Sequence, residues 1–164
     1  MTIYIFRHGM AVHPNKGYGS RVLTAELLPE GIPPIQRLGR YLALMPSDYQ
    51  ACSEVLRCRQ TAAIISNATG KAFVIDPRLR EYHQENFAEF SERVKDFADE
   101  LRQSSYQNVI LCTHGAVIAA LKHYLIDDSF SKRDETDYTQ TGQLLVIHDD
   151  KSTEVLDFNT EVLV

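Results

Sequence analysis

Long apolar runs are missing from this sequence. The first one, from Thr2 to Phe6, is cut short by the charged Arg7. A membrane-spanning helix needs about 20 predominantly apolar residues in a row, and a secretory signal needs an uninterrupted apolar centre. We therefore expect no membrane anchor and no secretory signal, and we expect the protein in the cytoplasm.

Cysteine is also scarce, and the three that occur are Cys52, Cys58 and Cys112. Their odd number argues against a framework of disulfides. Their spacing is not that of a structural zinc site. We expect reduced thiols in a reducing compartment, packed as small buried apolar side chains.

Positive charge is in deficit, with 17 Lys and Arg against 22 Asp and Glu and a net charge of −5. Domains that bind nucleic acid usually carry a basic surface, so we expect no nucleic-acid partner. The sequence has no glycine-rich nucleotide loop either. The histidines His83, His123 and His148 lack the spacing of metal ligands.

What the sequence does contain is an alternation of short β-rich and longer amphipathic segments. Its 164 residues predict one domain, 1–164, with a single core. Strands are expected at 2–6, 50–53, 72–75, 109–112, 142–148 and 153–158, and helices at 33–45, 57–68, 87–101 and 115–125. This order predicts a three-layer α/β/α fold with a mostly parallel central sheet and an antiparallel edge.

Two of the expected strands end in a histidine and a glycine. The first runs into Arg7-His8-Gly9, and the strand at 109–112 runs into Thr113-His114-Gly115. Ligands of open α/β sheets bind outside the carboxyl ends of the strands. Because an Arg and a His at the exit of a buried strand are costly without a partner, this pattern predicts a site for a small anion.

Two further segments complete the pattern. They are 53–62, with the sequence SEVLRCRQTA, and Leu79-Arg80-Glu81. Together with the two His-Gly motifs they resemble the histidine phosphatases, the phosphoglycerate mutase-like superfamily, in the family's own order and over most of the chain. The short chain is similar to its small phosphatases of the SixA type, which act on protein phosphohistidine.

The resemblance implies roles for five residues. His8 is the nucleophile, because a neutral imidazole nitrogen can attack phosphorus and form a phosphohistidine that water then hydrolyses. Its other ring nitrogen must donate to a backbone carbonyl, which we expect near Gly9. Arg7 and Arg57 bind the phosphate through their guanidinium forks, and His114 as an imidazolium stabilises the phosphoryl oxygens. Glu81 is the general acid for the leaving group.

Some alternatives stay open. Without the resemblance, Arg57 would read as half of a surface ion pair and His114 as a capping or core histidine. Arg59 is expected on the surface. The stretch after Glu81 lacks the glycine usual in the family, so Glu85 is a rival general acid, and either carboxylate could be a solvated loop residue.

The sequence departs from the family a second time after Gly9. Pro14 occupies the position of an Asn that helps many members to bind phosphate. Asn15 or His13 are the candidates to replace it. Substrate specificity therefore cannot be transferred from the mutases.

A phosphatase is favoured over a mutase because only residues 80–87 separate the acid from the next helix. So short a segment leaves the pocket open to water. The expected substrate is a phosphorylated small molecule or a phosphohistidine protein, and the oligomeric state is left open. No metal or cofactor is needed, since the two Arg and His114 supply the positive charge. Alternatives are a mutase-type phosphoryl transfer and a non-catalytic module that senses phosphate or binds a partner.

Overall fold

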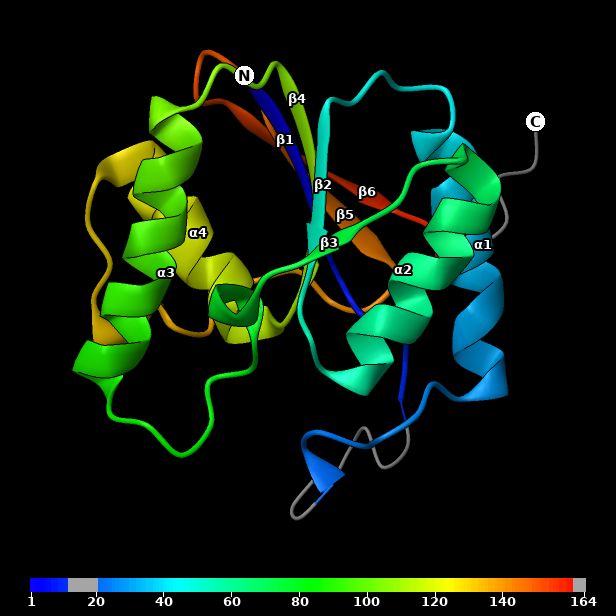
Figure 1. Cartoon of the computed structure of the whole chain (residues 1–164), viewed down its shortest axis with the longest axis horizontal. Helices are drawn as coiled ribbons and strands as arrows, with labels where there is room; N and C mark the ends of the chain where they lie inside the picture. The colour runs from blue at the N-terminus through cyan, green and yellow to red at the C-terminus, as the bar shows by residue number, and fades with distance from the viewer. Residues whose placement is uncertain (12–20, 161–164) are drawn as a thin grey trace.

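The computed structural model describes residues 1–11 and 21–160 (Figure 1). Six strands form one sheet in the order β3-β2-β4-β1-β5-β6. Their bounds are β1 Thr2–Arg7, β2 Tyr49–Cys52, β3 Val74–Ile75, β4 Asn108–Thr113, β5 Gln143–Ile147 and β6 Thr153–Asp157. The pairs among β3, β2, β4 and β1 are parallel, and β5 and β6 join antiparallel. The predicted mostly parallel sheet with an antiparallel edge is confirmed.

Helices cover both faces of the sheet. Their bounds are α1 Ile32–Leu42, α2 Leu56–Thr69, α3 Phe87–Gln103 and α4 Gly115–Asp127. Figure 1 shows α1 and α2 on one side of the strands and α3 and α4 on the other. Short 3₁₀ turns lie at Pro29–Gly31, Pro77–Leu79 and Lys132–Asp134. None of the helices in the described part of the chain is long and apolar enough to cross a membrane.

The alternation of side chains along β1 creates the two cores. Ile3 and Ile5 belong to the apolar cluster under α3 and α4, whereas Tyr4 and Phe6 belong to the cluster under α1 and α2. Successive strand residues point to opposite faces, so a strand that is apolar throughout must be covered on both. The three layers thus follow from the composition of β1.

The amphipathic pattern at 87–101 forms α3 as predicted. Asn86 caps its first turn by accepting a hydrogen bond from the Glu89 N–H at 2.8 Å. The expected apolar stripe is buried at Phe90, Val94 and Phe97. These aromatic side chains are core residues.

Two expectations change in detail. The strand predicted at 72–75 is only Val74–Ile75, and both side chains are exposed because β3 is an edge strand. The first long helix ends at Leu42 rather than near Met45. The loop predicted at 13–20 lies outside the described residues, as do its His13, Pro14 and Asn15. All three cysteines are free and buried, as expected.

Candidate active site

Three neighbouring parallel strands end at one edge of the sheet. The backbone N–H of His8, just after β1, donates to the Thr113 carbonyl at 3.2 Å, and the N–H of Ser53, just after β2, donates to the Cys112 carbonyl at 3.0 Å. His114 follows the central strand β4. The sheet therefore brings the two predicted histidines together, with ring centroids 5.4 Å apart.

His8 is held as one tautomer. Its Nδ1 lies 2.8 Å from the Gly9 carbonyl, which can only accept, so Nδ1 carries the proton and Nε2 keeps its lone pair. The predicted carbonyl is that of Gly9 itself. Burial, with the nearby positive charges of His114 and Arg57, lowers the pKa of His8 well below its ordinary value. A buried neutral imidazole results, whose unprotonated Nε2 accepts a hydrogen bond from Arg57 Nε at 3.1 Å.

Thr61 ties the turn after His8 to α2. Its hydroxyl accepts from the Gly9 N–H at 2.9 Å and donates to the Arg57 carbonyl at 2.7 Å. Gly9 has little room for a side chain, since a Cβ there would lie 3.0 Å from Ile35 Cγ1. Sequence reasoning assigned Thr61 no role, although its position four residues after Arg57 places the two on one helix face.

Arg57 lies in the first turn of α2 and is fully buried. Its Nε donates to His8 Nε2 at 3.1 Å, its Nη2 donates to Glu81 Oε2 at 2.8 Å, and its Nη1 donates to the carbonyl of Val22. The rigid fork thus connects the proposed nucleophile to the proposed acid. Arg59, by contrast, is exposed and donates to the Glu54 carbonyl at 2.9 Å, as expected for a surface residue.

Glu81 and His114 form an ion pair at the same place. Glu81 Oε2 lies 3.2 Å from His114 Nδ1. Burial by itself would raise the pKa of Glu81, but the hydrogen bond with His114 and the charges of His114 and Arg57 lower it to about 2. Burial would likewise lower the pKa of His114, yet the Cys58 sulfur and the Glu81 carboxylate raise it above its ordinary value. His114 is therefore an imidazolium and Glu81 a carboxylate.

The other ring nitrogen of His114 has neighbours that sequence reasoning did not predict. Nε2 lies 2.9 Å from Ser53 Oγ and 3.5 Å from Cys58 Sγ. An imidazolium donates through both nitrogens, so Ser53 and Glu81 together fix the ring. The signal for Ser53 was its place directly after a strand that ends beside β4.

The rival acid Glu85 lies in a different network. Its carboxylate accepts from Arg93 Nη2 at 2.5 Å and lies 3.8 Å from Arg80 Nη2. Of the two candidate acids, the structure places only Glu81 against Arg57 and His114. Glu85 is half of a largely buried ion pair with α3, and not the solvated carboxylate of the alternative reading.

Arg7 is the cation with unused donors. Its guanidinium lies over the ring of Tyr138, 5.3 Å from the centroid. Within the described part of the chain its buried Nε has no hydrogen-bond partner and the side chain makes no ion pair. Arg7 and Glu81 line a hollow of about 260 Å³, so the free donors lie beside the His8, Arg57 and His114 group.

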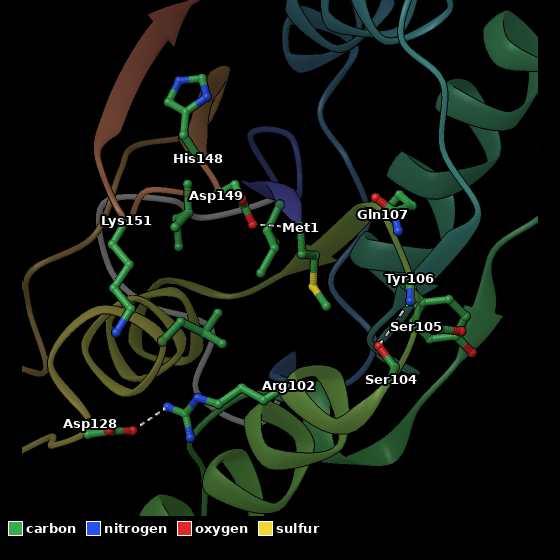
Figure 2. Close-up of a pocket in the computed structure, with 13 residues that line it drawn as sticks. Met1, Arg102, Ser104, Ser105, Tyr106, Gln107, Asp128, His148, Asp149 and Lys151 are labelled. Carbon is green, nitrogen blue, oxygen red and sulfur yellow. Dashed lines mark hydrogen bonds and ion pairs between the residues drawn. The ribbon is translucent and has the colours of Figure 1, made fainter.

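A larger hollow, of about 460 Å³, lies at the opposite edge of the sheet (Figure 2). Figure 2 shows two ion pairs in its lining, Arg102 with Asp128 at 3.0 Å and the amine of Met1 with Asp149. None of the predicted site residues lines it. The chemistry of the side chains, and not the size of the hollow, identifies the candidate site.

This arrangement coincides with a sequence match to a known family. The family model described as Histidine phosphatase superfamily (branch 1) matches residues 3–86 and 82–161. The chain belongs to this superfamily. Membership supports hydrolytic phosphatase activity, the class of enzyme that the motifs predicted.

Individual histidine phosphatases and solved structures are similar over most of the chain. "Putative phosphoserine phosphatase 2" of Hydrogenobacter thermophilus is 26% identical over 153 residues, covering 73% of this chain and 75% of that protein. The alpha-ribazole phosphatase of Shigella flexneri has a TM-score of 0.81 at 22% identity, covering 98% and 96% of the two chains. The "putative phosphohistidine phosphatase SixA" of Agrobacterium tumefaciens has a TM-score of 0.65 at 18% identity, covering 95% of each. The two structures show that the fold is shared.

Proposed function

We propose that this protein is a phosphohydrolase that works through a phosphohistidine on His8. The observation that carries the proposal is the hydrogen bond of His8 Nδ1 to the Gly9 carbonyl, because it leaves Nε2 unprotonated and beside Arg57. In the first step the Nε2–P bond forms and the P–O bond to the leaving group breaks. In the second, a water oxygen attacks phosphorus, the N–P bond breaks, and inorganic phosphate leaves.

Three cations surround the proposed reaction centre. Arg57, Arg7 and the imidazolium of His114 would stabilise the negative charge on the phosphoryl oxygens during both steps. In the structure the Glu81 carboxylate lies between Arg57 and His114, 2.8 and 3.2 Å from them. An oxygen of the substrate would take that place, with Glu81 displaced toward the leaving group.

The displacement of Glu81 also suits its role as general acid. Its pKa is low because Arg57 and His114 favour the carboxylate. An incoming phosphate takes over those partners and adds negative charge, and both changes raise the pKa of Glu81. Glu81 can then take up a proton from solvent and deliver it to the leaving oxygen, while His114 keeps its own proton and its charge.

The supported substrate class is a phosphomonoester or a protein phosphohistidine, in the cytoplasm. A relative of similar sequence is named for phosphoserine, and structural neighbours are named for alpha-ribazole phosphate and for phosphohistidine. One observation favours a second candidate, a module that binds phosphate without turnover. Glu81 is ion-paired and ionised in the free protein, and an acid that stayed so could not protonate an alkoxide.

Hydrolysis of an activated aryl phosphate without added metal tests the proposal. Such an ester has a good leaving group and needs little help from an acid. We expect turnover in the wild type and a loss of about 10³-fold or more in His8→Ala. His148→Ala, at the far edge of the sheet, is the matched control and should keep full activity. Full activity in His8→Ala would refute the mechanism, and phosphate binding without turnover in the wild type would favour the sensing module.

A further inference from the structure

The hollow beside the proposed site has to receive the part of the substrate that leaves. Its lining includes Arg7 and Glu81, the proposed phosphate ligand and the proposed acid. The scissile P–O bond must lie between them, so the leaving group extends into the remaining space. Glu135 and Thr136, in the loop after α4, also line that space.

Residues 134–137 of this loop carry three carboxylates with different surroundings. Asp134 accepts from the Ser131 N–H at 3.0 Å, and Asp137 accepts from Lys122 Nζ at 3.1 Å and lies 2.8 Å from His123 Nε2. Glu135 makes no side-chain hydrogen bond or ion pair within the described residues. It is the carboxylate of this loop that lines the hollow.

A half-buried carboxylate without a cation loses hydration and gains nothing in return. A positively charged group on the ligand would supply the missing partner. The hollow is therefore lined both by an unused positive donor, on Arg7, and by an unused carboxylate, on Glu135. That distribution matches a molecule whose phosphate and ammonium groups are separated by a short chain.

We propose that the preferred substrate is the phosphate ester of a small amino alcohol, with its ammonium group bound by Glu135. This inference rests on the proposed phosphatase function. The volume of about 260 Å³ is below the usual range of pockets for drug-sized ligands, about 300–1,000 Å³, so it limits the leaving group to a few heavy atoms. A leaving group that carries a carboxylate alone would be repelled by both Glu135 and Glu81.

Three two-carbon esters of different charge test the inference, namely phosphoethanolamine, ethyl phosphate and phosphoglycolate. The comparison is the ratio of kcat/KM between Glu135→Gln and wild type for each ester, which cancels the intrinsic reactivity of the leaving groups. We expect Glu135→Gln to lower kcat/KM about 10-fold for phosphoethanolamine, since the variant loses the charge-assisted hydrogen bond to the ammonium group. Ethyl phosphate should change less than about 2-fold and phosphoglycolate should gain, because only a charged ester feels the lost carboxylate.

The matched control is Asp137→Asn, which removes the same charge from the same loop but at a carboxylate already paired outside the hollow. The ratio of kcat/KM between Asp137→Asn and wild type should be the same for all three esters. If Glu135→Gln changes all three esters by one common factor, the amine inference is wrong while the phosphatase function stands. If the wild type hydrolyses neither these esters nor an aryl phosphate, the proposed function fails and the inference fails with it.

Discussion

One backbone carbonyl and one threonine hydroxyl determine the state of His8. The Gly9 carbonyl selects the tautomer, and Thr61 holds the N–H of the same residue. The nucleophile is thus positioned by its own chain neighbour and by α2, on which Arg57 also lies. Because Thr61 and Arg57 lie on one face of α2, the helix fixes the turn that carries His8 relative to the Arg57 side chain.

Thr61→Val should lower kcat with little change in overall shape. The substitution keeps the volume but leaves the Gly9 N–H and the Arg57 carbonyl without their partner, which costs about 1–3 kcal/mol of folding free energy. Loss of this positioning contact should lower kcat for an aryl phosphate about 10-fold or more, with the drop in kcat exceeding any change in KM.

Thr69→Val on the same helix is the control for Thr61. Thr69 also donates to the carbonyl four residues earlier and accepts a backbone N–H, from Lys71, but lies away from the site. It should lose stability without losing kcat. Equal effects of the two substitutions on kcat would contradict a positioning role for Thr61.

Glu81→Gln should shift the basic limb of the pH profile for an aryl phosphate. The reaction needs the imidazolium of His114, whose pKa is raised in part by Glu81. Activity is present below that pKa and is lost as the pH rises through it. Removing the carboxylate lowers the pKa of His114, so the basic limb should move to lower pH.

Glu85→Gln is the matched control for the acid. Its carboxylate pairs with Arg93 and not with His114, so the basic limb should not move. A basic limb that is the same in wild type and Glu81→Gln would show that the carboxylate does not hold the proton on His114.

The sequence motifs predicted Arg7, His8, Arg57, Glu81 and His114, and the structure gathers all five. Ser53 and Glu135 were not predicted, because their roles depend on strands and loops that meet only in the folded chain. Ser53 ends a predicted strand and opens the 53–62 motif, but its partner His114 is 61 residues away; Glu135 lies in a segment with no motif. The sequence alone also left Glu85 as a rival to Glu81 for the general acid. The structure separates the two because Glu85 pairs with the Arg93 side chain of α3.

At the scale of elements, the predicted helix bounds were most accurate where a hydrophobic pattern begins or ends at a capping residue. Asn86 begins α3, and Gly70, in the left-handed conformation at φ 74°, ends α2. The prediction was least accurate at β3. The segment at 72–75 has the composition of a buried strand. It lies at the edge of the sheet, however, where it pairs with β2 alone and forms a strand of only two residues.

Asn86→Ala should lower the free energy of unfolding by about 1 kcal/mol, the usual effect of losing an N-cap. The side chain accepts the Glu89 N–H, which alanine cannot do. Urea denaturation measures the change. Asn67→Ala, within α2 and exposed, is the control and should lose no stability. Both variants should hydrolyse an aryl phosphate at the wild-type rate, because neither residue contacts the site.

At the scale of the whole molecule, the two ends of the parallel strands differ in the side chains that they carry. The proposed nucleophile, its stabilising cations and the proposed acid lie at the carboxyl ends of β1, β2 and β4. The larger hollow, with two ion pairs in its lining, lies at the opposite ends of these strands (Figure 2). The three-layer fold was predictable because β1 is apolar on both faces. The hollow lined by Glu135 was not, since the residues after α4 have no periodic pattern.

Direct detection of the phosphorylated protein tests the central claim. The wild type and His8→Ala would each be mixed with an aryl phosphate, quenched within the first turnover at neutral to alkaline pH, where phosphohistidine survives, and measured by intact mass. We predict a species heavier by one phosphoryl group in the wild type and its absence in His8→Ala. A phosphorylated His8→Ala protein, or undiminished hydrolysis by that variant, would contradict the account.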